Sequence, residues 1–108
     1  DINDDGLPEI IAGSKSWNLF LLNTEGKILW RRFLGHSVTA LTLMHNDRTN
    51  LIVAGTDGGA VFCVDSNGNI VYRNQLKDAI TDIKTLDYDN YSIAIVSTCG
   101  GQNYLLTT

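Results

Sequence analysis

The sequence lacks a long apolar run, a basic stripe and a closely spaced pair of cysteines. No apolar run approaches the roughly 20 residues that span a bilayer, and no basic segment precedes one, so membrane insertion is not expected. The formal net charge is −4, and Arg31 and Arg32 are the only adjacent cations. Because phosphate neutralisation needs clustered Lys and Arg, nucleic acid is not an expected partner.

Cys63 and Cys99 lie in or at the end of apolar runs and form no C-x-x-C. We expect two reduced, mostly buried thiols, with a disulfide as the alternative. Catalytic motifs are missing as well: there is no G-x-S-x-G, no H-E-x-x-H and no P-loop, and "GTDGG" at residues 55–59 is expected to be a hairpin turn. His36 and His45 are expected to have surface or hydrogen-bonding roles. The chain is therefore not expected to be an enzyme.

What the sequence does have is the composition of one small globular domain. Its 108 residues are 44% apolar and 19% charged, which is neither a disordered nor a membrane composition. The chain begins at Asp1 without a methionine, so we expect a processed or excised piece of a longer protein.

The chain also repeats itself. Ala12-Gly13 falls on Ala54-Gly55, an offset of 42 residues, and the alignment continues without a gap. Asp5, Asp47 and Asp89 form a column through three copies. The copies span approximately residues 3–44, 45–86 and 87–108, the last one incomplete.

Each copy reads as short strands divided by turns. In the first copy these strands are "PEIIAGS", "NLFLLN", "KILWRRFL" and "SVTALTLM", and the second copy repeats the plan. Four strands per 42 residues predict a four-stranded antiparallel meander. Several strands, "NLFLL" and "AVFCV" among them, are apolar at consecutive positions, so both faces of each sheet must be covered.

No segment has helical periodicity, so the cover must come from other sheets of the same kind. The prediction is an all-β fold: a β-propeller fragment of about two and a half four-stranded antiparallel blades, with residues 1–108 part of one propeller domain. A β-sandwich or a β-solenoid is the alternative. Because blades bury their faces against neighbours, the chain alone is expected to be insoluble, oligomeric or partly folded.

Three propeller families share features with this chain. "DINDDGLPEIIAG" (residues 1–13) resembles the opening of FG-GAP repeats, and "FLLNTEGKILWRRFLG" (20–35) resembles the pyrroloquinoline-quinone-type repeat. "LGHSVTALTL" (34–43) is similar to the Gly-His opening of WD repeats, but the closing Trp-Asp is absent. The propeller domains of BBSome-type ciliary coat subunits are also similar in character.

The FG-GAP resemblance implies a calcium loop before the first strand. It maps four side chains and one carbonyl onto ligand positions, namely Asp1, Asn3, Asp5, Glu9 and the carbonyl of Leu7. Alternate residues of a tight loop can present oxygens to a hard cation while Gly6 makes the sharp turn. The alternative is that these side chains only cap a turn. The corresponding loops of the other copies keep fewer carboxylates, so calcium is expected at the first loop alone.

Two tryptophans have different expected roles. Trp30, with Tyr72 in the equivalent place, is expected to pack between blades, whereas Trp17 lies in a turn and is the candidate contact for a partner. We therefore expect a non-catalytic propeller scaffold or protein-interaction module, whose partners are proteins or further blades. Two alternatives stay open: a portion of a quinone-dependent dehydrogenase propeller, and a calcium-stabilised extracellular adhesion or carbohydrate-binding module.

Overall fold

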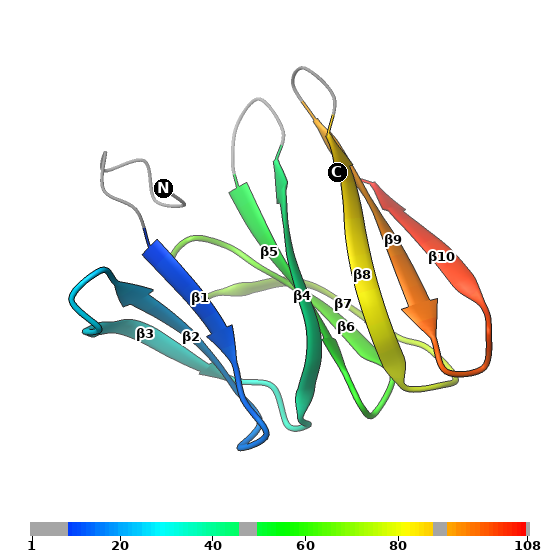
Figure 1. Cartoon of the computed structure of the whole chain (residues 1–108), viewed down its shortest axis with the longest axis horizontal. Coiled ribbons are helices and arrows are strands. Elements are labelled where there is room, and N and C mark those ends of the chain that lie inside the picture. The colour runs from blue at the N-terminus through cyan, green and yellow to red at the C-terminus, as the bar shows by residue number, and fades with distance from the viewer. Residues whose placement is uncertain (1–8, 46–49, 88–90, 108) are drawn as a thin grey trace.

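The computed structural model describes residues 9–45, 50–87 and 91–107 of the chain. Those residues form β-strands joined by turns and contain no helix (Figure 1). The strands are β1 (Glu9–Gly13), β2 (Asn18–Asn23), β3 (Ile28–Phe33), β4 (Val38–His45), β5 (Asn50–Thr56), β6 (Ala60–Val64), β7 (Ile70–Gln75), β8 (Ile80–Asp87), β9 (Ser92–Thr98) and β10 (Asn103–Thr107).

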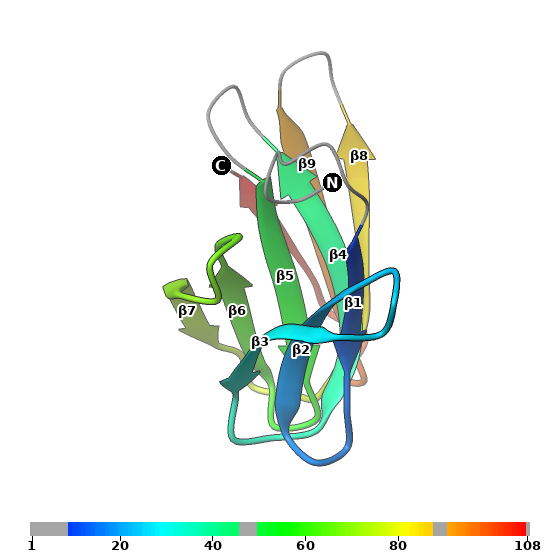
Figure 2. The same cartoon turned by 90° about the vertical axis from the view of Figure 1, so that its left-hand side faces the viewer.

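The strands make three antiparallel sheets. Sheet 1 has the order β1-β2-β3, sheet 2 the order β4-β5-β6-β7, and sheet 3 the order β10-β9-β8. Figure 1 shows the sheets side by side as a fan, with sheet 2 between the other two. In Figure 2 sheet 1 lies nearest the viewer. The all-β prediction and the antiparallel pairing are confirmed.

The sheets are offset by one strand from the copies in the sequence. The segment "SVTALTLM" was expected to close the meander of the first copy, but β4 pairs with β5 of the next sheet. The physical reason is the connection before it. Leu34 N–H donates to the Trp17 carbonyl (2.8 Å) and Val38 N–H donates to the Ser14 carbonyl (3.2 Å), so the chain crosses to the next sheet instead of turning back as a hairpin.

Irregular positions recur with the 42-residue period. The register shift at Leu21/Leu22 in sheet 1 is matched by one at Cys63/Val64 in sheet 2. The turns that follow also match, because the Asn23 and Asp65 side chains each accept two backbone N–H bonds at 2.9–3.0 Å. The copies are therefore alike in backbone detail as well as in apolar pattern.

The core lies between the sheets, in two clusters. The first joins sheets 1 and 2 and contains Leu19, Leu21, Leu34, Ile52, Ala54, Ala60, Phe62 and Val64. The second joins sheets 2 and 3 and contains Met44, Val53, Val61, Cys63, Ile80, Ile83, Ala94 and Val96. Among the described residues, sheet 2 is the sheet that has another sheet packed on each face, which accounts for the unbroken burial of β6.

In the part of the chain that the structure describes, no helix has the length and apolar character required to cross a bilayer.

Candidate functional site

The predicted calcium loop falls almost entirely outside the described residues. Asp1, Asn3, Asp5 and Leu7 all lie in the segment before residue 9, so their positions as ligands stay a prediction. Glu9 begins β1, where it is half-buried and pairs in register with Asn23. Among the described residues, no group of three or more His, Cys, Asp and Glu side chains is placed to hold a metal ion.

A histidine, an aspartate and a serine meet where sheets 2 and 3 adjoin. His45 Nε2 lies 3.4 Å from Asp87 Oδ1, and the Ser92 hydroxyl donates to the same carboxylate oxygen at 2.7 Å. Ser92 is fully buried and also accepts a bond from the His45 backbone N–H. The hydroxyl is therefore held by the carboxylate rather than by the imidazole. The arrangement ties β4 to β8 and β9, and it is not that of a serine activated by a histidine base.

The other histidine and the cysteines stand apart. His36 Nδ1 lies 3.7 Å from Asp57 Oδ1, and both side chains are about half exposed. Both cysteines are free thiols. Cys63 is buried, and burial raises the pKa of its thiol to about 11. Cys99 is exposed in the turn after β9, so the expectation that both thiols are mostly buried is wrong for it: β9 ends one residue earlier, at Thr98.

Trp30 packs between sheets, as predicted. It lies against the apolar cluster that joins sheets 1 and 2, and its Nε1–H donates to the Ser66 carbonyl of the β6–β7 turn at 2.9 Å. Two residues on, Arg32 Nε donates to the Gly68 carbonyl of the same turn at 2.5 Å. A side chain at Gly68 would overlap the Trp30 ring, since a Cβ there would lie 2.9 Å from Cδ2. Trp30 and Arg32 thus fix the outer strand of sheet 1 to sheet 2.

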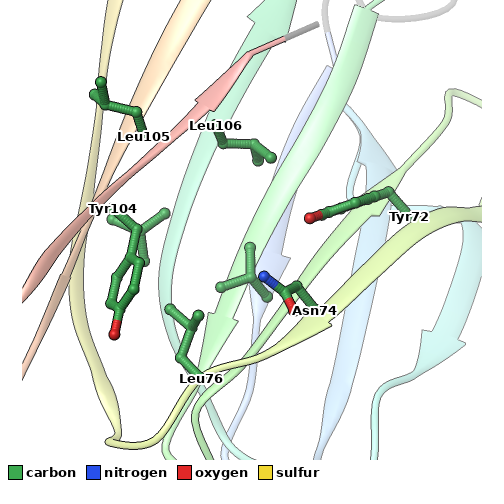
Figure 3. A pocket seen from close by; sticks show the side chains of 8 residues that line it. Tyr72, Asn74, Leu76, Tyr104, Leu105 and Leu106 are labelled. Carbon is green, nitrogen blue, oxygen red and sulfur yellow. The ribbon is translucent and has the colours of Figure 1, made fainter.

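Tyr72 and Asn74 occupy the equivalent positions in β7, and they line a cleft instead. The cleft has a volume of about 90 Å³ and lies between β7 and β10, with Leu76, Val96, Tyr104 and Leu106 among its other lining residues. Figure 3 shows Leu106 projecting toward Tyr72, whereas Leu105 projects from the opposite side of β10. Tyr72 is 43% exposed. Among the described residues, the outer part of the second interface is therefore open where the first is closed.

Trp17 and Phe33 form an exposed pair at one end of sheet 1, which we call the aromatic corner. Their ring centroids lie 6.1 Å apart at an interplanar angle of 55°. Trp17 is nevertheless 49% exposed and Phe33 60% exposed. Contact between the two rings therefore leaves about half or more of each residue exposed to solvent.

The backbone at Trp17 is unusual. Its φ is +73°, which makes it the one non-glycine residue with positive φ in the described chain. The residues 42 positions on are Gly59 (φ +85°) and Gly101 (φ +82°). A left-handed conformation costs a residue with a side chain roughly 1–2 kcal/mol, whereas glycine adopts it freely. At this turn, two copies have the residue that the backbone favours and the first copy has a tryptophan.

Hydrogen bonds hold the corner in place. Trp17 N–H donates to the Ser14 carbonyl (3.3 Å), and the Asn18 amide donates to the Ser16 carbonyl (3.0 Å). The Ser37 hydroxyl donates to the Lys15 carbonyl at 3.2 Å and links the turn to the crossing before β4. The indole thus projects from a turn whose backbone takes part in several hydrogen bonds.

Sequence reasoning found Trp17 but missed Phe33. Phe33 is the last residue of β3 and pairs in register with Asn18, next to Trp17. The contact depends on the antiparallel pairing of β2 with β3, and the apolar pattern alone does not show it. The sequence did contain an indication of the positive φ at Trp17, because the 42-residue offset aligns this residue with two glycines.

Comparison with known proteins supports the fold and no more specific assignment. No protein-family model matches the chain. No curated protein sequence matches it either.

Solved structures do match. The N-terminal part of BBS1 in complex with ARL6 has a TM-score of 0.76 at 15% identity, covering 94% of this chain and 33% of that one. BamB from Moraxella catarrhalis has a TM-score of 0.68 at 20% identity, covering 93% and 29%. The computationally designed Ika4 protein has a TM-score of 0.71 at 18% identity, covering 92% and 59%.

BBS1 and BamB are β-propellers, so the chain has the fold of a β-propeller fragment, and the predicted fold class is confirmed. The chain spans between 29% and 59% of the length of these structures. At such identities the likeness concerns the fold alone.

Proposed function

We propose that the chain is a non-catalytic part of a β-propeller scaffold and that it contacts a protein partner through the aromatic corner. The observation that supports this is the left-handed backbone of Trp17, in a turn where the other two copies have glycine. A backbone conformation that opposes stability persists where the residue has another use. An indole that stays half exposed gains little from burial, so we assign its use to contact with another molecule.

The chemistry of the corner suits a protein surface. Tryptophan is enriched among the residues that contribute most to protein–protein binding, because it offers a large rigid surface with one polar group. Lys15 lies exposed in the same turn, and Phe33 extends the apolar area. One of the structural neighbours is itself a propeller solved with a protein bound to it, which makes protein binding a reasonable use of this fold.

The non-catalytic part of the proposal rests on the side chains around the polar groups. The best candidate for chemistry, Ser92, is fully buried and bonded to a carboxylate. Quinone-dependent dehydrogenase activity in the parent protein, measured with a dye acceptor after adding the quinone, would overturn this part of the proposal.

Photo-crosslinking tests the contact. A photoreactive amino acid is placed at Trp17 and, as the matched control, at Gly101, the equivalent turn position of sheet 3, where a Cβ meets no atom within 4 Å. The expected result is that in the native cell extract a protein is captured from position 17 and not from position 101. With that protein purified, Trp17→Gly should weaken binding by more than about tenfold, as loss of an interface tryptophan does.

Two outcomes would contradict the proposal. One is capture of the same proteins from both positions. The other is a captured partner that binds the Trp17→Gly variant as tightly as the unmodified chain.

A further inference from the structure

The charged side chains of sheet 1 are divided between its two ends. Glu9 begins β1 and Glu25 lies in the β2–β3 turn, so the two carboxylates in the described part of this sheet are at the same end. The β1–β2 turn, which carries the aromatic corner, is at the other end of β1 (Figure 1). The charged residues next to the corner are Lys15, in the same turn, and Arg31, in β3.

Arg31 and Phe33 lie on the same face of β3. Trp30 and Arg32 face sheet 2, where they donate to its β6–β7 turn, and side chains alternate between the two faces along a strand. Arg31 and Phe33 therefore project from the opposite face, about 7 Å apart along the strand. Both residues are exposed, so the guanidinium group extends the surface that the aromatic corner offers.

The exposure of these two positions does not depend on whether another sheet covers this face. In sheet 2 the equivalent residues are Arg73 and Gln75. Sheet 1 packs on that face of sheet 2, and both residues nevertheless remain exposed. A sheet packed on sheet 1 in the same way would therefore leave Arg31 and Phe33 in contact with solvent.

No carboxylate of the described chain neutralises the two cations. Neither of them forms an ion pair within residues 9–45, 50–87 and 91–107. Asp57 of the β5–β6 turn lies beside His36 instead, 3.7 Å from its Nδ1. Arg73 Cζ lies 5.5 Å from the Phe62 ring centroid, whereas within the same ranges Arg31 has no ring contact of this kind. The charges at the corner are therefore available to another molecule.

We propose that the partner binds the aromatic corner through a short acidic segment. An apolar side chain of this segment packs on the Trp17–Phe33 pair, and a neighbouring carboxylate pairs with Lys15 or Arg31. The inference rests on the proposed function and names the chemistry of the partner. Opposite charges across an interface direct the encounter and exclude partners of the wrong sign.

A short segment fits the chain better than a long polyanion such as a nucleic acid. The whole chain has a formal net charge of −4, which repels a polyanion that extends beyond the corner. Binding of a nucleic acid also requires several clustered cations to neutralise successive phosphates, and the corner has two.

Selection from random short peptides displayed on phage, with the 108-residue chain as bait, tests the inference. The selected peptides should contain an excess of Asp and Glu next to an apolar residue. Lys15→Glu and Arg31→Glu should each weaken binding of these peptides by about fivefold, the upper end for an exposed ion pair. Lys27→Glu is the matched control, because Lys27 is exposed in the β2–β3 turn at the other end of the sheet, and it should leave binding unchanged. Far-UV circular dichroism checks that all three variants keep their β-structure.

Trp17→Gly separates this inference from the proposed function. Selected peptides that need Trp17 but show no acidic excess would overturn the inference and leave the proposed function standing. The same holds if the two charge-reversed variants bind the peptides as tightly as the unmodified chain, or if no peptide is selected. Acidic peptides that bind Trp17→Gly unchanged would contradict both. Tighter binding of a single-stranded oligonucleotide than of any selected peptide would overturn the inference in favour of a nucleic-acid surface.

Discussion

The two interfaces between the sheets use equivalent residues but differ in which strands make the side-chain hydrogen bonds. Between sheets 1 and 2 these bonds come from the outer strand, where Trp30 and Arg32 donate to the β6–β7 turn, while the crossing before β4 adds the bond from Val38 N–H to the Ser14 carbonyl. Between sheets 2 and 3 they lie on the inner strands. There Thr39 donates to the Ile80 carbonyl at 2.6 Å, and the Thr42 and Thr85 hydroxyls are 3.0 Å apart.

The difference follows from which strands each sheet contributes. In the described chain sheet 1 has no strand inside β1, and sheet 3 has none outside β10. The first interface therefore includes contacts of the outer strands, and the second includes contacts between the inner strands. Both interfaces share the apolar contacts of the middle strands. Trp30 and Tyr72 occupy equivalent positions on outer strands, but in the described chain only Trp30 has an outer turn of the next sheet to contact.

Truncating the outer contact should show the largest contrast. Trp30→Ala removes a packed ring and a hydrogen bond, so we expect it to lower the free energy of unfolding by about 3 kcal/mol. Tyr72→Ala, at the equivalent position beside the open cleft, should lower it by no more than about 1 kcal/mol. Urea denaturation at one fixed, low protein concentration measures both. Equal losses would mean that the two interfaces do not differ as described.

Calcium should distinguish the segment before β1 from the equivalent segments of the other copies, residues 46–49 between β4 and β5 and residues 88–90 between β8 and β9. If the first loop binds the ion, calcium at 100 times its dissociation constant stabilises the fold by about 2.7 kcal/mol through mass action. Asp5→Ala should abolish the rise in melting temperature, and the matched changes Asp47→Ala and Asp89→Ala should leave it intact. Identical melting curves with calcium and with a chelator would remove the calcium hypothesis.

The glycines between the sheets should respond unequally to a methyl group. Gly55→Ala forces a Cβ against Ile80, which is 1% exposed and held in β8, so we expect a loss of about 2 kcal/mol. Gly13→Ala meets Val38, which is only half-buried and has more room to move, so about 1 kcal/mol or less is expected. Thermal melts of the two variants compare them, and a larger loss at Gly13 would reverse the order of rigidity that the structure implies.

Two substitutions at Trp17 distinguish the effect of its strained backbone on stability from the effect of losing its ring. Glycine relieves the left-handed strain and alanine does not, although both remove the indole. Trp17→Gly should therefore be about 1 kcal/mol more stable than Trp17→Ala. The matched change Gly101→Ala should cost a similar amount, because Gly101 has φ +82° and space for a Cβ. If Trp17→Ala proved as stable as Trp17→Gly, the backbone at residue 17 would not be strained.

Much of this fold could be predicted from the sequence because the information is local and repeated. The apolar runs, the turn residues and the 42-residue offset together indicate sheets of strands stacked on their faces. The grouping of strands into sheets could not be predicted in the same way. The segment at residues 37–44 has the same pattern whether it pairs backward or forward, and the choice depends on hydrogen bonds across the Leu34–Val38 crossing.

The candidate site was predictable in part. Trp17 was visible as an aromatic residue in a turn, but its neighbour Phe33 depends on strand register, and the exposure of Cys99 depends on where β9 ends. The different surroundings of Trp30 and Tyr72 could not be read from their equivalent positions. They depend on which strands each sheet contributes, and a repeat pattern does not specify this.

Hydrogen exchange at the two indole N–H groups tests the account most directly, since it separates the tryptophan that joins the sheets from the one that stays free for a partner. The Trp30 Nε1–H donates to the Ser66 carbonyl, whereas the Trp17 indole has no hydrogen-bond acceptor among the described residues. Two-dimensional ¹⁵N NMR should show one indole N–H signal that is protected from exchange and that disappears in Trp30→Phe. The other indole N–H should exchange with solvent as fast as that of a free tryptophan, and its signal should disappear in Trp17→Gly. Similar exchange rates for both indoles, or protection of Trp17 instead of Trp30, would contradict the account.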